Sequence, residues 1–198
     1  MQAGCGLHAR HEAYVRLRLT GSGMEQADTA QWPAEIHKVL GAHAVRQVAY
    51  VPDAGHKELI VLCGRDAGMK SVPLTTEEEG IALLAGAWLG GERGVLLLQS
   101  SGVGNCINML SLARTCRFPL LMLVTMRGQW GEFNPWQVPM GQATPAVLRE
   151  MGALVFDAER REEIGETVNA AARMVFNGPG MAAVLISQRI LGAKTFGR

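Results

Sequence analysis

Residues 75–88 read TTEEEGIALLAGAW, which places three carboxylates at the start of an otherwise apolar helix rich in small side chains. Acidic residues are ordinary in a first helical turn, because the unpaired N–H groups and the helix dipole favour negative charge there. Thr75 or Thr76 would be the N-cap, and this ordinary role accounts for two of the carboxylates. The small residues between Gly80 and Ala87 allow close burial of the helix, so we predict that one carboxylate lies inside the protein.

Outward from this helix, short apolar runs alternate with helical patterns. Strands that are apolar along their whole length are typical of a parallel sheet covered on both sides. We therefore predict a doubly wound α/β domain with a mostly parallel six-stranded sheet, helices on both faces and right-handed crossovers. The predicted strands are residues 47–51, 69–74, 94–99, 119–126, 153–156 and 181–187. The predicted helices are residues 28–41, 56–62, 76–88, 103–116 and 159–176, with a short helix from Thr144 after a loop at 127–143.

The domain is predicted to span residues 24–198. Residues 1–23 have weak periodicity and end in Gly21-Ser22-Gly23, just before Met24. We expect this segment to be a flexible tail, or an extension upstream of the true start.

The composition excludes several classes of protein. With 198 residues, 48% apolar and 19% charged, the chain suits one globular domain, and its net charge of +1 does not favour nucleic acid or an anionic membrane. No apolar run approaches the roughly 18 residues of a membrane helix, and the N-terminus lacks a secretory apolar segment, so we expect a cytoplasmic protein. The four cysteines lack CxxC or Cys/His ligand spacing, which predicts reduced thiols and no metal site.

The expected ligand site lies at one edge of the sheet, because ligands of open parallel sheets bind beyond the carboxyl ends of the strands. The turns after Val51, Leu74, Gln99 and Met126 meet there. One of them, residues 100–105, reads SSGVGN. It lacks the third glycine of a dinucleotide fingerprint, and the chain has neither a P-loop Gly-Lys-Ser/Thr nor a GxSxG elbow. A tight turn that simply requires glycine remains an alternative.

Residues 76–86, the strand at 94–99 and the segment 100–105 together resemble the pyrimidine-binding domain of thiamine-diphosphate enzymes. Within that group they are most similar to the alpha subunit of sulfopyruvate decarboxylase and the matching half of phosphonopyruvate decarboxylase. The resemblance covers roughly residues 26–190. In this family a Glu nine residues before the helix glycine touches the aminopyrimidine ring, and counting back from Gly86 gives Glu77. Glu78 would take the role if the count were shifted by one.

The resemblance implies a mechanism and a cofactor site. The carboxyl of Glu77 would hydrogen-bond a ring nitrogen of the cofactor and so help to remove the proton from the thiazolium carbon, which attacks the ketone of a 2-oxo acid. The cofactor then accepts the electrons when carbon dioxide leaves. Because residues 100–105 pack against the aminopyrimidine in this family, the expected cofactor-binding residues are Glu77, Ser101, Gly102, Val103 and Asn105.

Two further stretches are candidates for contact with the substrate. In the turn 51–56, Asp53 is either an N-cap or a catalytic residue, and His56 is either a helix-start histidine or a proton-transfer or anion-binding group. In the segment 127–137, Arg127 and Gln137 are predicted to bind an anionic substrate, since a guanidinium suits carboxylate, sulfonate or phosphonate. The alternative is that the aromatic side chains of this segment form a subunit interface. They are Trp130, Phe133 and Trp136.

In the resembled enzymes, Gly-Asp-Gly and a downstream Asn on a second domain hold the diphosphate through Mg²⁺, and these 198 residues contain no such string. We therefore expect a diphosphate-binding beta subunit as partner, carrying the Mg²⁺, in a homo- or hetero-oligomer that decarboxylates a small anionic 2-oxo acid. Two alternatives are a subunit of a carboligating, acetolactate-synthase-like enzyme and a non-catalytic α/β partner subunit that has kept the fold.

Overall fold

The computed structural model describes residues 31–178 and 180–192. Its core is a six-stranded sheet with the strand order β2-β1-β3-β4-β6-β5, and all five strand pairs are parallel. The strands are β1 (Val45–Tyr50), β2 (Lys70–Pro73), β3 (Arg93–Gln99), β4 (Leu120–Thr125), β5 (Leu154–Ala158) and β6 (Met181–Ile186). The predicted doubly wound α/β fold is confirmed.

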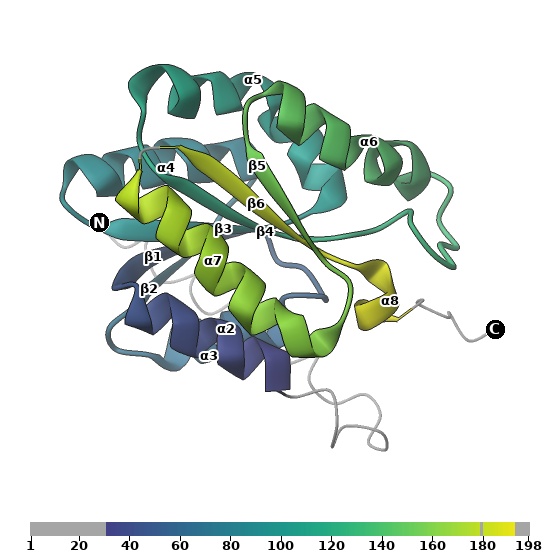
Figure 1. Ribbon diagram of the computed structural model, residues 1–198, viewed down its shortest axis with the longest axis horizontal. Helices are drawn as coiled ribbons and strands as arrows, with labels where there is room; N and C mark the ends of the chain where they lie inside the picture. Colours follow the sequence, from purple (N-terminus) through teal and green to yellow (C-terminus); the bar gives the residue numbers. More distant parts are fainter. Residues whose placement is uncertain (1–30, 179, 193–198) are drawn as a thin grey trace, which may run out of the picture. The chain divides into compact units, whose positions relative to one another are not determined.

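Helices cover both faces of the sheet (Figure 1). On one face lie α2 (Gln31–Ala42), α3 (Lys57–Arg65) and α7 (Ile164–Asn177), and on the other lie α4 (Glu77–Leu89), α5 (Ser100–Cys116) and α6 (Gln137–Glu150). The short elements η1 (Arg161–Glu163) and α8 (Gln188–Leu191) complete the described part. No helix within it is long and apolar enough to cross a membrane.

The continuous apolar strands are explained by two hydrophobic cores, one on each face. Along β3, Val95 and Leu97 belong to the core under α2, α3 and α7, while Leu96 and Leu98 belong to the core under α4, α5 and α6. Successive side chains of a strand point to opposite faces, so a strand buried on both faces needs apolar residues throughout. All four side chains are fully buried.

The structure corrects the prediction that residues 100–105 form a turn. Helix α5 begins at Ser100, directly after the last residue of β3, and Gln99 is its N-cap in an extended conformation. The two glycines of this segment lie inside the helix. Gly102 packs against the carboxyl group of Glu77, and Gly104 faces the side chain of Met140. These glycines therefore allow close packing and do not make a turn.

The predicted loop at 127–143 was too long, because α6 starts at Gln137 and not at Thr144. Pro139 is tolerated near the helix start, where backbone N–H groups have no partner inside the helix. Pro145 lies inside the helix, and Gly141 approaches the backbone of Arg127 so closely that a Cβ would overlap it. The connection after β4 is thus residues 126–136.

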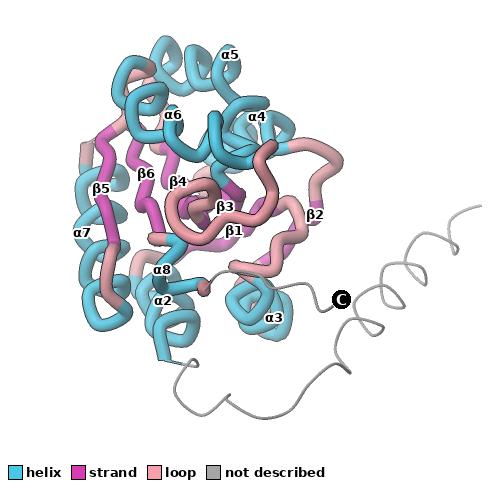
Figure 2. The backbone as a smooth tube through the Cα atoms, turned by 90° about the vertical axis from the view of Figure 1, so that its right-hand side faces the viewer, coloured by secondary structure: helices cyan, strands magenta, loops and turns pink. Residues whose placement is uncertain are grey.

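Figure 2 looks onto the edge of the sheet where the strands end, and the connections after β1, β2 and β4 lie in front of it. Three adjacent strands, β1, β3 and β4, bring their last residues to this edge. The predictions for residues 1–23 and for the first three residues of the helix at 28–41 concern residues outside the described ranges.

Candidate active site

Glu77 is the first residue of α4 and is buried, with 9% of its surface exposed. Its Oε2 accepts a hydrogen bond of 2.8 Å from Nδ2 of Asn105 in α5. Gly102, one turn earlier in α5, has no room for a side chain, because a Cβ there would overlap the Glu77 carboxyl group. The prediction that one of the three carboxylates lies inside is confirmed, and α5 determines how that carboxyl group is oriented.

The two neighbouring carboxylates have ordinary roles at the helix start. Glu78 Oε2 accepts a hydrogen bond of 2.7 Å from the hydroxyl of Thr76, and Glu79 Oε2 accepts one of 2.9 Å from the backbone N–H of Thr75. Thr76 is the N-cap residue, although its hydroxyl makes no cap hydrogen bond. These local contacts agree with the expectation that two of the three carboxylates serve the helix terminus.

A second carboxylate, Asp53, lies just beyond the end of β1 with 8% of its side chain exposed. It accepts hydrogen bonds from Thr125 Oγ1 at 2.5 Å, from Gln99 Nε2 at 3.0 Å and from the backbone N–H of Gly55 at 3.1 Å. It is not the N-cap of α3, since that position is taken by His56. Burial alone would raise the pKa of Asp53, but His56 and these three hydrogen bonds together lower it.

His56 is fully buried, and neither ring nitrogen has a hydrogen-bond partner among the described residues. Its Nδ1 lies 3.8 Å from Oδ2 of Asp53. Burial lowers the pKa of His56 to about 4, against the opposing effect of Asp53. The imidazole is therefore neutral at pH 7, so near neutrality the hydrogen bonds, and not a charged imidazole, keep Asp53 ionised.

The remaining predicted cofactor residues are placed at the start of α5. Ser101 Oγ donates a hydrogen bond of 3.0 Å to Gln99 Oε1. The side chain of Val103 is fully buried in the core under α4, α5 and α6. Only the backbone of Val103 could therefore reach a ligand. The thiol of Cys106, in the same helix, is held neutral because burial and then the nearby Glu77 and Glu78 raise its pKa to about 12.

Arg127 follows the end of β4, and its guanidinium binds both oxygens of Glu132, at 2.7 Å from Nε and 2.6 Å from Nη2. The hydrogen bonds from Arg127, aided by those from Asn134, Gly128 and Gln188, lower the pKa of Glu132 to about 2 despite its burial. The side chains of Arg127 and Glu132 are 11% and 3% exposed, respectively. This pair is neutral as a unit, so the Arg127 charge is already matched.

Gln188 in α8 connects the same segment to the end of β6. Its Oε1 accepts from the backbone N–H groups of Gln129 and Trp130, and its Nε2 donates to Glu132 at 2.9 Å. Gln137, the other predicted substrate-binding residue, begins α6 and has a buried Oε1 without a hydrogen-bond partner among the described residues.

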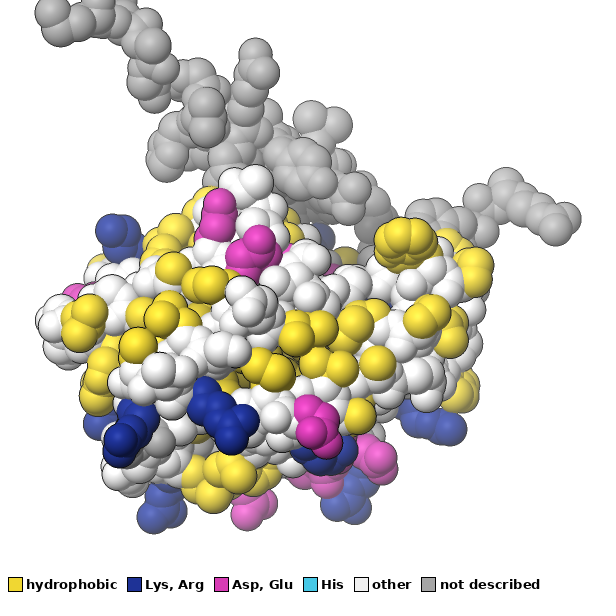
Figure 3. Space-filling view, turned by 90° about the horizontal axis from the view of Figure 1, so that it is seen from above, with side chains coloured by type: hydrophobic (Ala, Val, Ile, Leu, Met, Phe, Trp, Pro, Cys, Tyr) yellow, Lys and Arg dark blue, Asp and Glu magenta, His cyan; other side chains and the backbone are white. Residues whose placement is uncertain are grey.

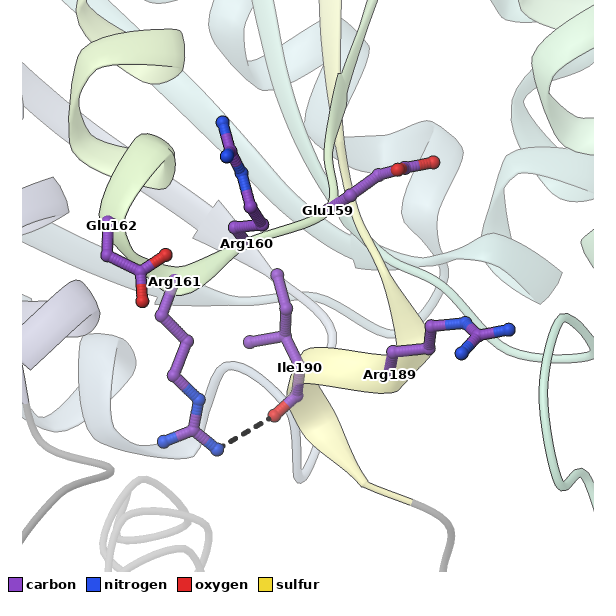
Figure 4. A pocket seen from close by; sticks show the side chains of 6 residues that line it. All are labelled: Glu159, Arg160, Arg161, Glu162, Arg189 and Ile190. Carbon is purple, nitrogen blue, oxygen red and sulfur yellow. Dashed lines mark hydrogen bonds between the residues drawn. The ribbon is translucent and has the colours of Figure 1, made fainter.

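Sequence reasoning missed four residues of this edge: Gln99, Thr125, Glu132 and Gln188. Gln99 and Thr125 carried a usable signal, since each is the polar residue that closes an apolar strand. Glu132 and Gln188 carried none, because their pairing joins residues far apart in the sequence. A cavity of about 350 Å³ lies away from the predicted residues, between Glu159, Arg160, Arg161, Glu162, Arg189 and Ile190 (Figure 4).

Residues 34–137 match the family described as thiamine pyrophosphate enzyme, N-terminal TPP binding domain, and this match covers more than half of the chain. The chain belongs to this family. Thiamine pyrophosphate is the same compound as thiamine diphosphate, so the resemblance inferred from residues 76–105 is confirmed.

Three relatives with similar sequences are decarboxylases or decarboxylase subunits by name. Sulfopyruvate decarboxylase subunit alpha of Methanococcus maripaludis is 32% identical over 152 residues, which are 76% of this chain and 91% of the relative. The subunit of the same name from Methanothermobacter thermautotrophicus is 39% identical over 129 residues, 62% of this chain and 78% of the relative. Phosphonopyruvate decarboxylase of Streptomyces viridochromogenes is 39% identical over 117 residues, 58% of this chain and 30% of the relative.

A solved structure shares the fold. The 2-oxoglutarate:ferredoxin oxidoreductase from Magnetococcus marinus superposes with a TM-score of 0.66 and 14% identity, covering 80% of this chain and 29% of that one. At this identity the likeness concerns the fold only.

The site of this TPP-binding domain fits the pyrimidine half of the cofactor. One oxygen of the buried Glu77 carboxyl group is held by Asn105, and Oε1 has no hydrogen-bond partner among the described residues. The absence of a side chain at Gly102 lets this carboxyl group pack directly against the backbone of α5. Within the described ranges, no group of three or more His, Cys, Asp or Glu side chains could hold a metal ion.

Proposed function

We propose that the chain is the alpha subunit of a two-subunit thiamine-diphosphate-dependent decarboxylase that acts on sulfopyruvate or phosphonopyruvate. The observation that carries this proposal is the buried Glu77 carboxyl group, oriented by Asn105 against Gly102 in a TPP-binding domain. The relatives named sulfopyruvate decarboxylase subunit alpha support the substrate class and the need for a second subunit.

The bound cofactor would supply the electron sink on which decarboxylation depends. The chain's own residues hold and move protons around it. Asn105 fixes Oε2 of Glu77, so Oε1 is the atom placed to exchange a proton with a ring nitrogen of the pyrimidine. Glycine at position 102 lets the carboxyl group pack directly against α5, which restricts its orientation.

Asp53 and His56 would serve the later proton steps. When a 2-oxo acid loses carbon dioxide, the carbon that carried it must take up a proton before the aldehyde is released. Asp53 is ionised and His56 is neutral near pH 7, so the pair would first take up a proton from water and then pass it to that carbon. Both lie at the edge of the sheet where ligands of this architecture bind.

The anionic end of the substrate would be bound near Arg127 and Gln137. Because Glu132 already matches the charge of Arg127, a sulfonate or phosphonate would have to share that guanidinium. Nε and Nη2 bind Glu132, which leaves Nη1 for the substrate. The buried amide oxygen of Gln137 lies in the helix that starts after this segment. The substrate role of both residues stays a prediction.

The partner is proposed to be a diphosphate-binding beta subunit that carries Mg²⁺. Supporting this, the 198 residues contain no Gly-Asp-Gly string, and the described residues contain no metal-binding cluster. A surface for such a partner is available, because Trp130, Phe133 and Trp136 are 46%, 51% and 81% exposed. Aromatic side chains of this size are enriched at protein interfaces.

The proposal is tested by purifying the chain together with its beta subunit and supplying thiamine diphosphate, Mg²⁺ and one 2-oxo acid at a time. We expect one carbon dioxide and one aldehyde per molecule of sulfopyruvate or phosphonopyruvate, and slower turnover of pyruvate. Products that contain a new carbon–carbon bond would show a carboligating enzyme instead. No turnover of any 2-oxo acid by a folded complex would contradict the proposed function.

A further inference from the structure

Residues at the ends of three adjacent strands interact through the carboxylate of Asp53. Asp53 lies just beyond β1, Gln99 is the last residue of β3 and Thr125 is the last residue of β4. Gln99 Nε2 donates to Oδ1 of Asp53 at 3.0 Å, and Thr125 Oγ1 donates to Oδ2 at 2.5 Å. Each carboxylate oxygen is therefore held by a side chain from a different strand.

A simple turn does not require this arrangement. The turn after β1 needs only the hydrogen bond from the backbone N–H of Gly55 to Oδ2 of Asp53. The two side-chain donors are additional, and the packing around them is tight, since a Cβ at Gly55 would lie 2.7 Å from Cγ2 of Thr125. Asp53 also caps no helix, because the N-cap of α3 is His56.

We propose that Gln99 and Thr125 are positioning residues that hold the Asp53 carboxylate in a single orientation at the edge where substrate binds. This inference rests on the proposed function, which places Asp53 in the proton steps. A carboxylate has about four acceptor positions. Gly55 and Thr125 occupy two on Oδ2 and Gln99 occupies one on Oδ1, so the position left open is on Oδ1.

Fixing the carboxylate in this way has a catalytic consequence. A proton-transfer group works only within hydrogen-bond reach of its target, and small misplacements are costly. Donors from two separate strands prevent rotation of the Asp53 carboxyl group, which would otherwise exchange Oδ1 and Oδ2. Among the described residues, His56 on the α3 side is the titratable group that acts on Asp53, while β3 and β4 contribute only uncharged side chains.

The test compares Thr125→Val, which removes the hydroxyl at nearly constant shape, with Thr125→Ser, which restores it. Gln99→Met removes the second donor.

In the complex with the beta subunit, we expect Thr125→Val and Gln99→Met to lower kcat by roughly 10- to 100-fold with KM changed less than about 2-fold. The acid limb of the pH profile should move to higher pH, and Thr125→Ser should recover wild-type behaviour. Thr167→Val is the matched control, because it removes a hydroxyl that donates to the backbone carbonyl of Glu163. It should change neither kcat nor the pH profile.

A second readout does not depend on activity. Carboxyl-labelled aspartate in the full-length chain allows the titration of Asp53 to be followed by NMR, with Asp53→Asn to assign the signal. Its midpoint should rise in Thr125→Val and return in Thr125→Ser. An unchanged midpoint, or a Ser variant as impaired as the Val variant, would overturn the positioning role. If the wild-type complex is inactive but the titration midpoint of Asp53 still rises in Thr125→Val, the result counts against the proposed function and not against the positioning role.

Discussion

Three adjacent glutamates of this chain have three different surroundings. Glu77 is buried against α5, Glu78 accepts a hydrogen bond from Thr76, and Glu79 is exposed and accepts one from the backbone of Thr75. The difference follows from helix geometry, since consecutive residues project about 100° apart and only one of three faces the neighbouring helix. Chemistry that requires a carboxyl group shielded from water is therefore available to Glu77 alone of the three.

The first prediction concerns Glu77→Gln in the complex with the beta subunit. The amide keeps the size of the side chain and can still contact Asn105, but it cannot exchange a proton. We expect kcat to fall by roughly 10²- to 10⁴-fold with the fold intact, measured by turnover and by thermal unfolding. Glu78→Gln is the matched control. A larger loss in the control would shift the role by one residue, and near-normal turnover of Glu77→Gln would exclude it.

The second prediction separates two roles of Arg127, binding of the substrate and structural pairing with Glu132. If its guanidinium binds the anionic end of the substrate, Arg127→Ala should raise KM for sulfopyruvate or phosphonopyruvate by roughly 10- to 100-fold and leave KM for pyruvate nearly unchanged. Glu132→Gln removes the charge that is paired with Arg127 and should not raise KM for the anionic substrates. Equal effects of Arg127→Ala on all three substrates would show that the ion pair only holds the segment 126–136 in place.

The third prediction is a pH dependence of stability that arises from His56. In the unfolded chain the imidazole of His56 takes up a proton near pH 6.5, whereas in the folded chain it stays neutral down to about pH 4. The unfolded state thus binds more protons in this window, and stability falls as pH decreases from 6.5 to 4, by on the order of 3 kcal/mol. Urea unfolding between pH 4 and 7.5 should show this slope, and His56→Leu should flatten it.

The contribution of Glu132 falls in a different pH window. Its pKa is lowered from its ordinary value to about 2, so its stabilisation is present above pH 4.5 and is lost as pH falls toward 2. Glu132→Gln should therefore leave the slope between pH 6.5 and 5 unchanged. Identical slopes for the wild type and His56→Leu in that range would contradict the assignment to His56.

At the level of elements, the sequence identified the strands and most helices because burial on both faces leaves a direct pattern. Leu96, Leu97 and Leu98 are buried on alternating faces of the sheet, so all three are apolar. This apolar run correctly predicted a strand. The starts of α5 and α6 were read wrongly for the opposite reason. Glycine and proline normally interrupt helices, and here Gly102 and Gly141 allow close contacts with Glu77 and Arg127 that only the tertiary structure contains.

The candidate site was also predicted only in part. The burial of one carboxylate was predicted from the small residues of the helix, and the structure shows that Glu77 is the buried one. Its role toward the cofactor stays a prediction. The donors to Asp53 were not assigned. Gln99 and Thr125 each close an apolar strand with a polar residue, but the sequence does not show that β3 and β4 pair beside β1 and so bring them to Asp53. Periodicity describes which face of an element is buried, but it does not describe which residues of separate elements meet.

The fourth prediction belongs to the contact between α4 and α5. Gly102→Ala adds a methyl group where the Glu77 carboxyl group lies, so we expect a loss of roughly 1–3 kcal/mol in the free energy of unfolding and a displaced carboxyl group. Gly86→Ala is the control, because Gly86 is a helix residue of α4 with nothing near its missing side chain. That change should be neutral or stabilising by up to about 1 kcal/mol. Urea unfolding of the separate chain measures both, and equal effects would contradict the close contact.

At the scale of the whole molecule, the α4, α5 and α6 layer presents an unusually apolar outer surface. Residues 80–89 of α4 and 100–113 of α5 include no charged side chain. Figure 3 shows this face, with hydrophobic side chains spread across it. Large apolar residues remain exposed on or beside it: Trp88, Leu89, Ile107, Leu112, Trp136 and Val138. Extended apolar surface on a soluble domain usually marks a site of interaction.

The final prediction follows from this surface together with the missing Mg²⁺ ligands. In the proposed function Glu77 contacts the pyrimidine half of the cofactor, and the charged diphosphate half needs a cation with oxygen ligands. The described residues contain no group of three or more His, Cys, Asp or Glu side chains that could hold a metal ion. We therefore expect calorimetric titration of the separate chain with thiamine diphosphate and Mg²⁺ to show little or no binding. Binding should appear when the beta subunit is added, and Glu77→Gln should weaken it without preventing assembly. Tight, Mg²⁺-dependent binding by the separate chain would contradict the division of the cofactor site between two subunits, because a single chain would then hold both halves of the cofactor.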